Sequence, residues 1–148
     1  MASMVRWNAV LGVVCFVFAV HVARSVAYAV AEDVGPGQLI GAWRGRSICT
    51  DLTAAPACHD ETVVYEFTAG AQRDAVHWVA DKVVAGHRER MGEMELEYDK
   101  AEGCWKAFFT SPRIKSVWRL TVEGSRMTGT ARLLPGNETI RKLGLQRE

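Results

Sequence analysis

The sequence predicts an all-β protein, an eight-stranded antiparallel meander that closes into an up-and-down barrel. Apolar and polar residues alternate over stretches of about six to ten residues, which is the period of half-buried strands. Turn residues separate these stretches, and the connections are too short for the crossover helices that parallel strands need. An open meander would expose two strand edges, so closure into a barrel is the simplest arrangement.

The expected strands each have one apolar and one polar face, as a closed antiparallel sheet requires. They cover residues 39–49, 61–68, 74–83, 87–98, 104–110, 115–122, 126–133 and 138–147. Glycine, proline, asparagine and charged residues fill the connections between them, and these residue types favour turns.

The register of one hairpin can be predicted from its turn. A turn over residues 100–103 sets Tyr98 opposite Trp105, and the same register continues until Met94 lies opposite Phe109. The other face of this strand then carries a row of four acidic residues, Glu93, Glu95, Glu97 and Asp99. Such a row fits a Ca²⁺ site, a contact with a basic partner, or a solvated outer face neutralised by neighbouring Lys and Arg side chains.

Residues 1–31 have the parts of a secretory signal peptide. Arg6 supplies the positive start, residues 9–23 are apolar, and small residues at alternate positions end the segment. A membrane anchor is the alternative, but the apolar run is shorter than the roughly 20 residues that cross a bilayer. We expect an exported protein, periplasmic or extracellular, with a flexible leader over 32–38 and the barrel over 39–148.

The composition is that of one globular domain. Of 148 residues, 49% are hydrophobic and 24% are charged, and the net charge is +1. A near-neutral charge argues against a nucleic-acid or polyanion binder. We expect a mature chain that is a monomer without stable membrane insertion.

The cysteines left after the signal peptide are Cys49, Cys58 and Cys104, an odd number. Cys49 and Cys58 flank a short segment that contains a proline, and an exported pair at this spacing is typical of a disulfide. A zinc site with the adjacent His59 is the alternative, although no CxxC pair accompanies it. Cys104 then remains as a free thiol or as the link of a disulfide-bonded dimer.

The first and last strands resemble those of the calycin superfamily, which includes lipocalins, fatty-acid-binding proteins and avidins. The resemblance is carried by Gly41-Ala42-Trp43 and by the last-strand arginines, Arg141 and Arg147, both of which we expect at the closed end. It implies that Gly41 allows a close backbone approach and that a guanidinium lies over the Trp43 ring, closing one end of the barrel.

A second resemblance is to bacterial periplasmic inhibitors of secreted metalloproteases. It is carried by Leu39, Gly41 and Trp43 with a cysteine a few residues later. Those inhibitors are small barrels with one disulfide, and the resemblance implies that an extended N-terminal arm, here residues 32–38, would enter a protease.

No catalytic motif occurs in the chain, neither G-x-S-x-G nor HExxH nor a glycine-rich phosphate loop. His59, His77 and His87 have no spacing that brings them to one site. We therefore expect no enzyme, no metal and no cofactor.

The inward-facing aromatic residues are the candidate ligand site: Trp43, Tyr65, Trp78, Tyr98, Trp105 and Trp118. Aromatic side chains inside a barrel either fill it or line a pocket for a small apolar or aromatic ligand, and Ser47 and Lys82 are candidate polar groups near its mouth. A small-ligand binding protein is the favoured function. A protein-binding module such as a protease inhibitor is the alternative, and a structural envelope protein is the third.

Overall fold

A computed structural model describes residues 35–148 of the chain. It contains one 3-10 turn, η1 (Pro36–Gln38), and eight strands. The strands are β1 (Gly41–Cys49), β2 (Glu61–Ala69), β3 (Ala75–Val84), β4 (His87–Asp99), β5 (Cys104–Thr110), β6 (Lys115–Glu123), β7 (Arg126–Leu133) and β8 (Thr139–Arg147). The expected signal peptide lies outside the described residues. Across residues 35–148, no helix has the length and apolar character needed to cross a membrane.

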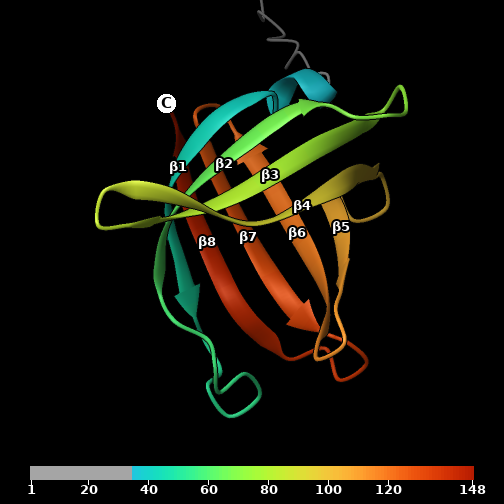
Figure 1. Cartoon of the computed structure of the whole chain (residues 1–148). Helices are drawn as coiled ribbons and strands as arrows, with labels where there is room; N and C mark the ends of the chain where they lie inside the picture. Colours follow the sequence, from blue (N-terminus) through green and yellow to red (C-terminus); the bar gives the residue numbers. More distant parts are fainter. Residues whose placement is uncertain (1–34) are drawn as a thin grey trace, which may run out of the picture. The chain divides into compact units, whose positions relative to one another are not determined.

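The strands form a closed antiparallel barrel in which each strand pairs with the next and β8 returns to β1 (Figure 1). This confirms the predicted fold class and strand order. The alternation in the sequence explains the closure, because inward positions such as Val63, Tyr65 and Phe67 are buried in the core.

The pairing of β4 with β5 is much shorter than its turn predicts. Tyr98 pairs with Trp105 as expected, but only three residue pairs form between these strands. The predicted continuation to Met94 opposite Phe109 is wrong. We call the unpaired stretch, residues 93–96 of β4 and 107–110 of β5, the open seam.

A β-bulge interrupts β4 beyond the open seam. The register of β3 with β4 shifts between Ala80 and Asp81, which leaves Met91 as an extra residue on β4. Bulges increase strand twist and bend the bulged strand. Beyond this point the hairpin of β3 and β4 projects from the barrel wall, as Figure 1 shows.

Two arginines of β4 bind Asp81 of β3 and join the two strands of this hairpin, and Asp81 is buried beneath them. Arg88 donates to Asp81 Oδ2 at 2.6 Å from Nη2, and Arg90 Nε donates to Oδ1 at 2.7 Å. Burial by itself raises the pKa of Asp81, but the hydrogen bonds from Arg90 and Arg88 outweigh it and hold the pKa below its usual range.

We expect Asp81→Asn to lower the free energy of unfolding by roughly 1–3 kcal/mol at neutral pH, with the exposed arginines keeping the effect modest. Because the folded-state pKa is lowered, the carboxylate stabilises the fold above its unfolded-state pKa and loses this effect as pH falls through the folded value. Melting curves of both proteins at pH 7 and pH 3 check this. A stability gap that does not narrow at pH 3 would contradict the assignment.

One end of the barrel is closed by Trp43. Its ring is fully buried, its Nε1 donates to the Leu39 carbonyl at 2.8 Å, and the Arg147 guanidinium lies 4.3 Å from the ring centroid. Gly41 has a φ of 122°, which favours glycine, and Arg147 packs against it. The Arg147 guanidinium and the Leu39 carbonyl thus hold the Trp43 ring in place at this end.

The expectation that Arg141 also closes this end needs correction. Arg141 pairs with Cys49 at the opposite end of β1, whereas Arg147 pairs with Trp43. Six residues of extended strand separate the two arginines by about 20 Å, so both cannot reach one tryptophan.

The expected leader, residues 32–38, needs a partial correction too. Residues 36–38 form the 3-10 turn, and Arg147 donates to the carbonyl oxygens of Gln38 and Ile40, the latter at 2.6 Å. This part of the segment is therefore fixed against the closed end rather than extended as a free arm. Residues 32–34 lie outside the described part of the chain.

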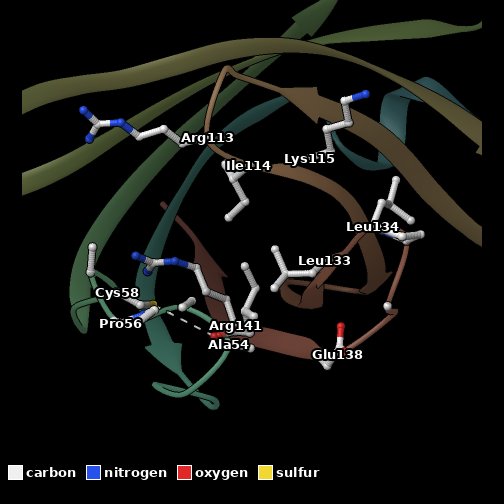
Figure 2. Close-up of a pocket in the computed structure, with 15 residues that line it drawn as sticks. Ala54, Pro56, Cys58, Arg113, Ile114, Lys115, Leu133, Leu134, Glu138 and Arg141 are labelled. Atoms are coloured by element: carbon white, nitrogen blue, oxygen red, sulfur yellow. Dashed lines mark hydrogen bonds between the residues drawn. The ribbon is translucent and has the colours of Figure 1, made fainter.

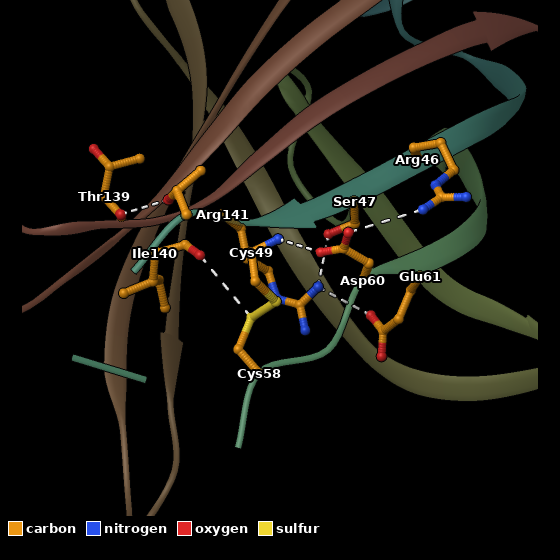
Figure 3. Close-up of a disulfide and its surroundings, with 10 residues drawn as sticks. Arg46, Ser47, Cys49, Cys58, Asp60, Glu61, Thr139, Ile140 and Arg141 are labelled. Carbon is orange, nitrogen blue, oxygen red and sulfur yellow. Dashed lines mark hydrogen bonds and ion pairs between the residues drawn. A yellow bond between two sulfur atoms is a disulfide. The ribbon is translucent and has the colours of Figure 1, made fainter. Parts of the chain in front are cut away.

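At the open end, Cys49 and Cys58 form the predicted disulfide, with an S–S distance of 2.00 Å (Figure 3). The Cys49 amide donates to Asp60 Oδ1 at 2.8 Å, and Thr50 donates through its hydroxyl to the Thr139 carbonyl at 2.6 Å. The loop between the two cysteines is thereby fixed to β1 and β8 beside the barrel mouth.

Candidate ligand-binding site

The barrel interior is filled in one half and hollow in the other. At the closed end, large side chains such as Trp43, Leu39 and Phe67 pack without exposure to solvent. Toward the open end lies a cavity of about 160 Å³. Its lining comes from β1, β2, β3, β4, β5, β6 and β8: Ser47, Glu61, Tyr65, Trp78, Ala80, Met91, Gly92, Met94, Phe109, Trp118 and Arg141.

Three aromatic residues form one wall of the cavity. Trp78 is fully buried and meets Tyr65 with ring centroids 4.8 Å apart and Trp118 with centroids 5.3 Å apart, both edge to face. Edge-to-face contacts of this kind are favourable and rigid. The indole N–H groups of Trp78 and Trp118 have no hydrogen-bond acceptor among the described residues. These two N–H groups are the polar atoms of an otherwise apolar aromatic wall.

A polar cluster occupies the end of the cavity next to the disulfide. Arg141 Nη1 donates to Ser47 Oγ at 2.8 Å and to Glu61 Oε2 at 3.1 Å, as Figure 3 shows. Burial raises the pKa of Tyr65 well above its usual range, and the positive charge of Arg141 offsets only part of this. Tyr65 therefore stays an uncharged phenol, and the two charges of the cluster compensate each other.

The part of the cavity wall between the strands of Trp78 and Trp118 belongs to the open seam and the bulge beside it. Met91, Met94 and Phe109 line the cavity there, and Met91 is 38% exposed. Methionine side chains are flexible and polarizable, and they adapt to ligands of different shape. This part of the wall is the most adaptable one around the cavity.

The structure brings together only half of the predicted ligand residues. Tyr65, Trp78 and Trp118 line the cavity. Trp43 closes the other end, while Tyr98 and Trp105 pack on each other with centroids 5.3 Å apart, away from the cavity. Ser47 lies at the cavity mouth as expected from the sequence, but Lys82 does not line it.

The sequence analysis missed Met91, Gly92, Glu61 and the role of Arg141. Strand residues point alternately into and out of the barrel, and Met94, Phe109 and Arg141 fall at inward positions. The alternation therefore predicts part of the cavity lining. The same alternation includes Gly92, two residues before Met94, whereas Met91 is the extra residue of the bulge and no sequence pattern places it in the wall.

A second hollow of about 700 Å³ lies at the same end, between the disulfide loop and the turns that follow β5 and β7 (Figure 2). Ile114, Leu133 and Leu134 form its apolar wall, and Arg113 and Lys115 lie at its rim. It is a broad surface groove, and only Arg141 is shared with the barrel cavity.

The described residues contain no group of three or more metal-ligating side chains close enough to hold an ion. The predicted acidic row is instead part of an ion-pair network. His77 Nδ1 lies 2.8 Å from Glu95, Glu93 pairs with Arg90, and Asp99 accepts from Lys106 at 2.7 Å.

Cys104 is a free thiol buried in the barrel wall at the start of β5. Burial raises its pKa, and the nearby Glu102 carboxylate raises it further. We therefore expect Ellman's reagent to leave the native protein nearly unmodified over an hour and to modify one thiol promptly in denaturant. Prompt reaction in native buffer would show an accessible thiol and would favour the disulfide-linked dimer.

Comparisons of the chain with protein-family models, with curated proteins and with solved structures found no match. The resemblance to calycins and that to metalloprotease inhibitors stay predictions.

Proposed function

We propose that the protein binds a small, uncharged ligand of about one aromatic ring in the barrel cavity, without converting it chemically. The observation that carries this proposal is the cavity itself, an apolar hollow of about 160 Å³ against a buried aromatic cluster. An apolar cavity of about 150 Å³ in another protein binds benzene, so the volume suits a single ring.

The polar cluster supports an uncharged ligand rather than a charged one. Arg141 and Glu61 already pair with each other, so a ligand of either charge would meet a like charge beside its partner. A hydroxyl or carbonyl group suits this end, because both Ser47 and the arginine offer hydrogen bonds. We take p-cresol, a methylated ring with one hydroxyl, as the probe.

We further propose that this binding takes place outside the cytoplasm. The support is the disulfide between Cys49 and Cys58, because such bonds persist in oxidising compartments. The N-terminal sequence features of a signal peptide agree with it.

Gly92→Leu tests the site. A Cβ at Gly92 would meet no atom within 4 Å, and its cross-strand partner Ala80 lines the same cavity. A leucine side chain is therefore expected to fill the cavity without strain and to weaken p-cresol binding at least tenfold, which corresponds to about 1.4 kcal/mol. Tryptophan fluorescence during titration measures the affinity, because Trp78 and Trp118 adjoin the site.

Gly144→Leu is the matched control. Gly144 is exposed on β8, and a Cβ there also meets nothing within 4 Å, but it does not line the cavity. It should bind p-cresol as the native protein does. Equal binding by the Gly92→Leu variant, or no binding by the native protein at millimolar p-cresol, would overturn the proposed site.

A further inference from the structure

We propose that the open seam is a docking site for an extended segment of a partner protein in which basic and apolar residues alternate. The segment would add a strand between β4 and β5. This goes beyond the proposed function, because it concerns a protein partner and the outer wall rather than the small ligand.

The first argument is the state of the backbone. Residues 93–96 pair with β3 only, and residues 107–110 pair with β6 only. Each stretch therefore presents unpaired N–H and C=O groups along one edge, which is the template that strand addition uses. Proteins commonly protect such edges with proline or lysine, and residues 107–110, Ala-Phe-Phe-Thr, contain neither.

The second argument is the space on both faces of the seam. Inside the barrel, Met94 and Phe109 line the ligand cavity. Outside it, a hollow of about 660 Å³ adjoins Glu95, Glu97 and Phe108, and Phe108 is 68% exposed. An added strand points its side chains alternately to the two faces, so both faces have room for them.

The third argument is charge, which selects the kind of segment. On the β4 side the outer face carries Glu93 and Glu95, which lie beside Arg90 and His77, and Glu97, which lies opposite Lys106 but has no ion pair among the described residues. On the β5 side the only cation is Lys106, which is already bound by two carboxylates, those of Asp99 and Glu102. Outward residues of the segment should therefore be basic.

The same geometry defines the length and the inward residues. Four residues of free edge span about 13 Å, so a segment of four or five residues fits. Its inward side chains would lie between Met94 and Phe109 and should be apolar. An outward arginine could in addition stack on the exposed Phe108 ring.

The probe is the blocked, labelled peptide Arg-Val-Arg-Val-Arg, and the readouts are fluorescence anisotropy and amide hydrogen exchange. We expect binding and slower exchange of those amides of residues 107–110 that point into the seam. The matched peptide Glu-Val-Glu-Val-Glu should bind at least tenfold more weakly. A version of the arginine peptide with alternate amides N-methylated should lose binding, because it cannot pair with the edge.

Two variants test whether the peptide recognises the open seam or only the negative charge of the surface. Glu97→Lys should weaken the arginine peptide several-fold, whereas Glu123→Lys, the same charge change at the exposed end of β6, should not. Equal effects of both changes, equal binding of both peptides, or unchanged exchange at residues 107–110 would overturn the proposal. Glu97→Lys should keep p-cresol binding, because Glu97 does not line the cavity, so failure of the docking site and failure of the ligand site are distinguishable.

Discussion

Replacement of Trp43 by alanine is expected to lower the free energy of unfolding by about 3–5 kcal/mol, the largest effect of any single change considered for this barrel. The ring is fully buried, and its removal leaves a cavity at the closed end. It also leaves the Leu39 carbonyl without its donor and the Arg147 guanidinium without the ring beneath it. Urea unfolding followed by far-ultraviolet circular dichroism measures the loss.

Trp43→Phe is the control for this change. Phenylalanine keeps an aromatic face for Arg147 and most of the volume but has no N–H for Leu39. We expect it to recover more than half of the stability that alanine loses. A Trp43→Ala protein within about 1 kcal/mol of the native one would contradict the assignment of this end as the closed, tightly packed one.

Gly45→Ala is expected to destabilise the barrel by about 3 kcal/mol. A Cβ at Gly45 would lie 2.1 Å from the carbonyl oxygen of Gly144 and 2.8 Å from Leu145 Cα. Both are backbone atoms, so no side-chain rotation relieves the overlap, and β1 and β8 would have to separate where the barrel closes on itself.

Gly144→Ala is the matched control, on the partner strand and with nothing within 4 Å of its Cβ. It should change the free energy of unfolding by less than about 0.5 kcal/mol. Thermal unfolding of the two variants side by side compares them. Equal melting temperatures would mean that β1 and β8 do not approach as closely as described.

The fold could be predicted from the sequence because the information that specifies it is local. Alternation sets which side of each strand is buried, and short turns allow only antiparallel neighbours. The Cys49–Cys58 spacing predicted the disulfide for the same reason. The rise per residue alone would have placed Arg141 and Arg147 at opposite ends of the last strand.

The cavity and the seam could not be predicted, because both depend on contacts between distant residues. The pairing of β4 with β5 ends at Glu97, and farther along β4 come the bulge at Met91 and the bonds from Arg88 and Arg90 to Asp81. The sequence left open whether the interior is filled or hollow. Ala80 and Gly92 are small inward residues, and they leave the open half of the barrel hollow.

The most direct test of the ligand site is the NMR spectrum of the protein with ¹³C-labelled methionine methyl groups, recorded during a titration with p-cresol. Met91 and Met94 line the cavity, whereas Met127 is fully buried in the core outside its lining. We expect saturable shifts of the Met91 and Met94 methyl signals from the ring current of the bound probe, and an unchanged Met127 signal. Shifts absent from Met91 and Met94, or equally large at Met127, would contradict the proposal that the hollow half of the barrel is the binding site.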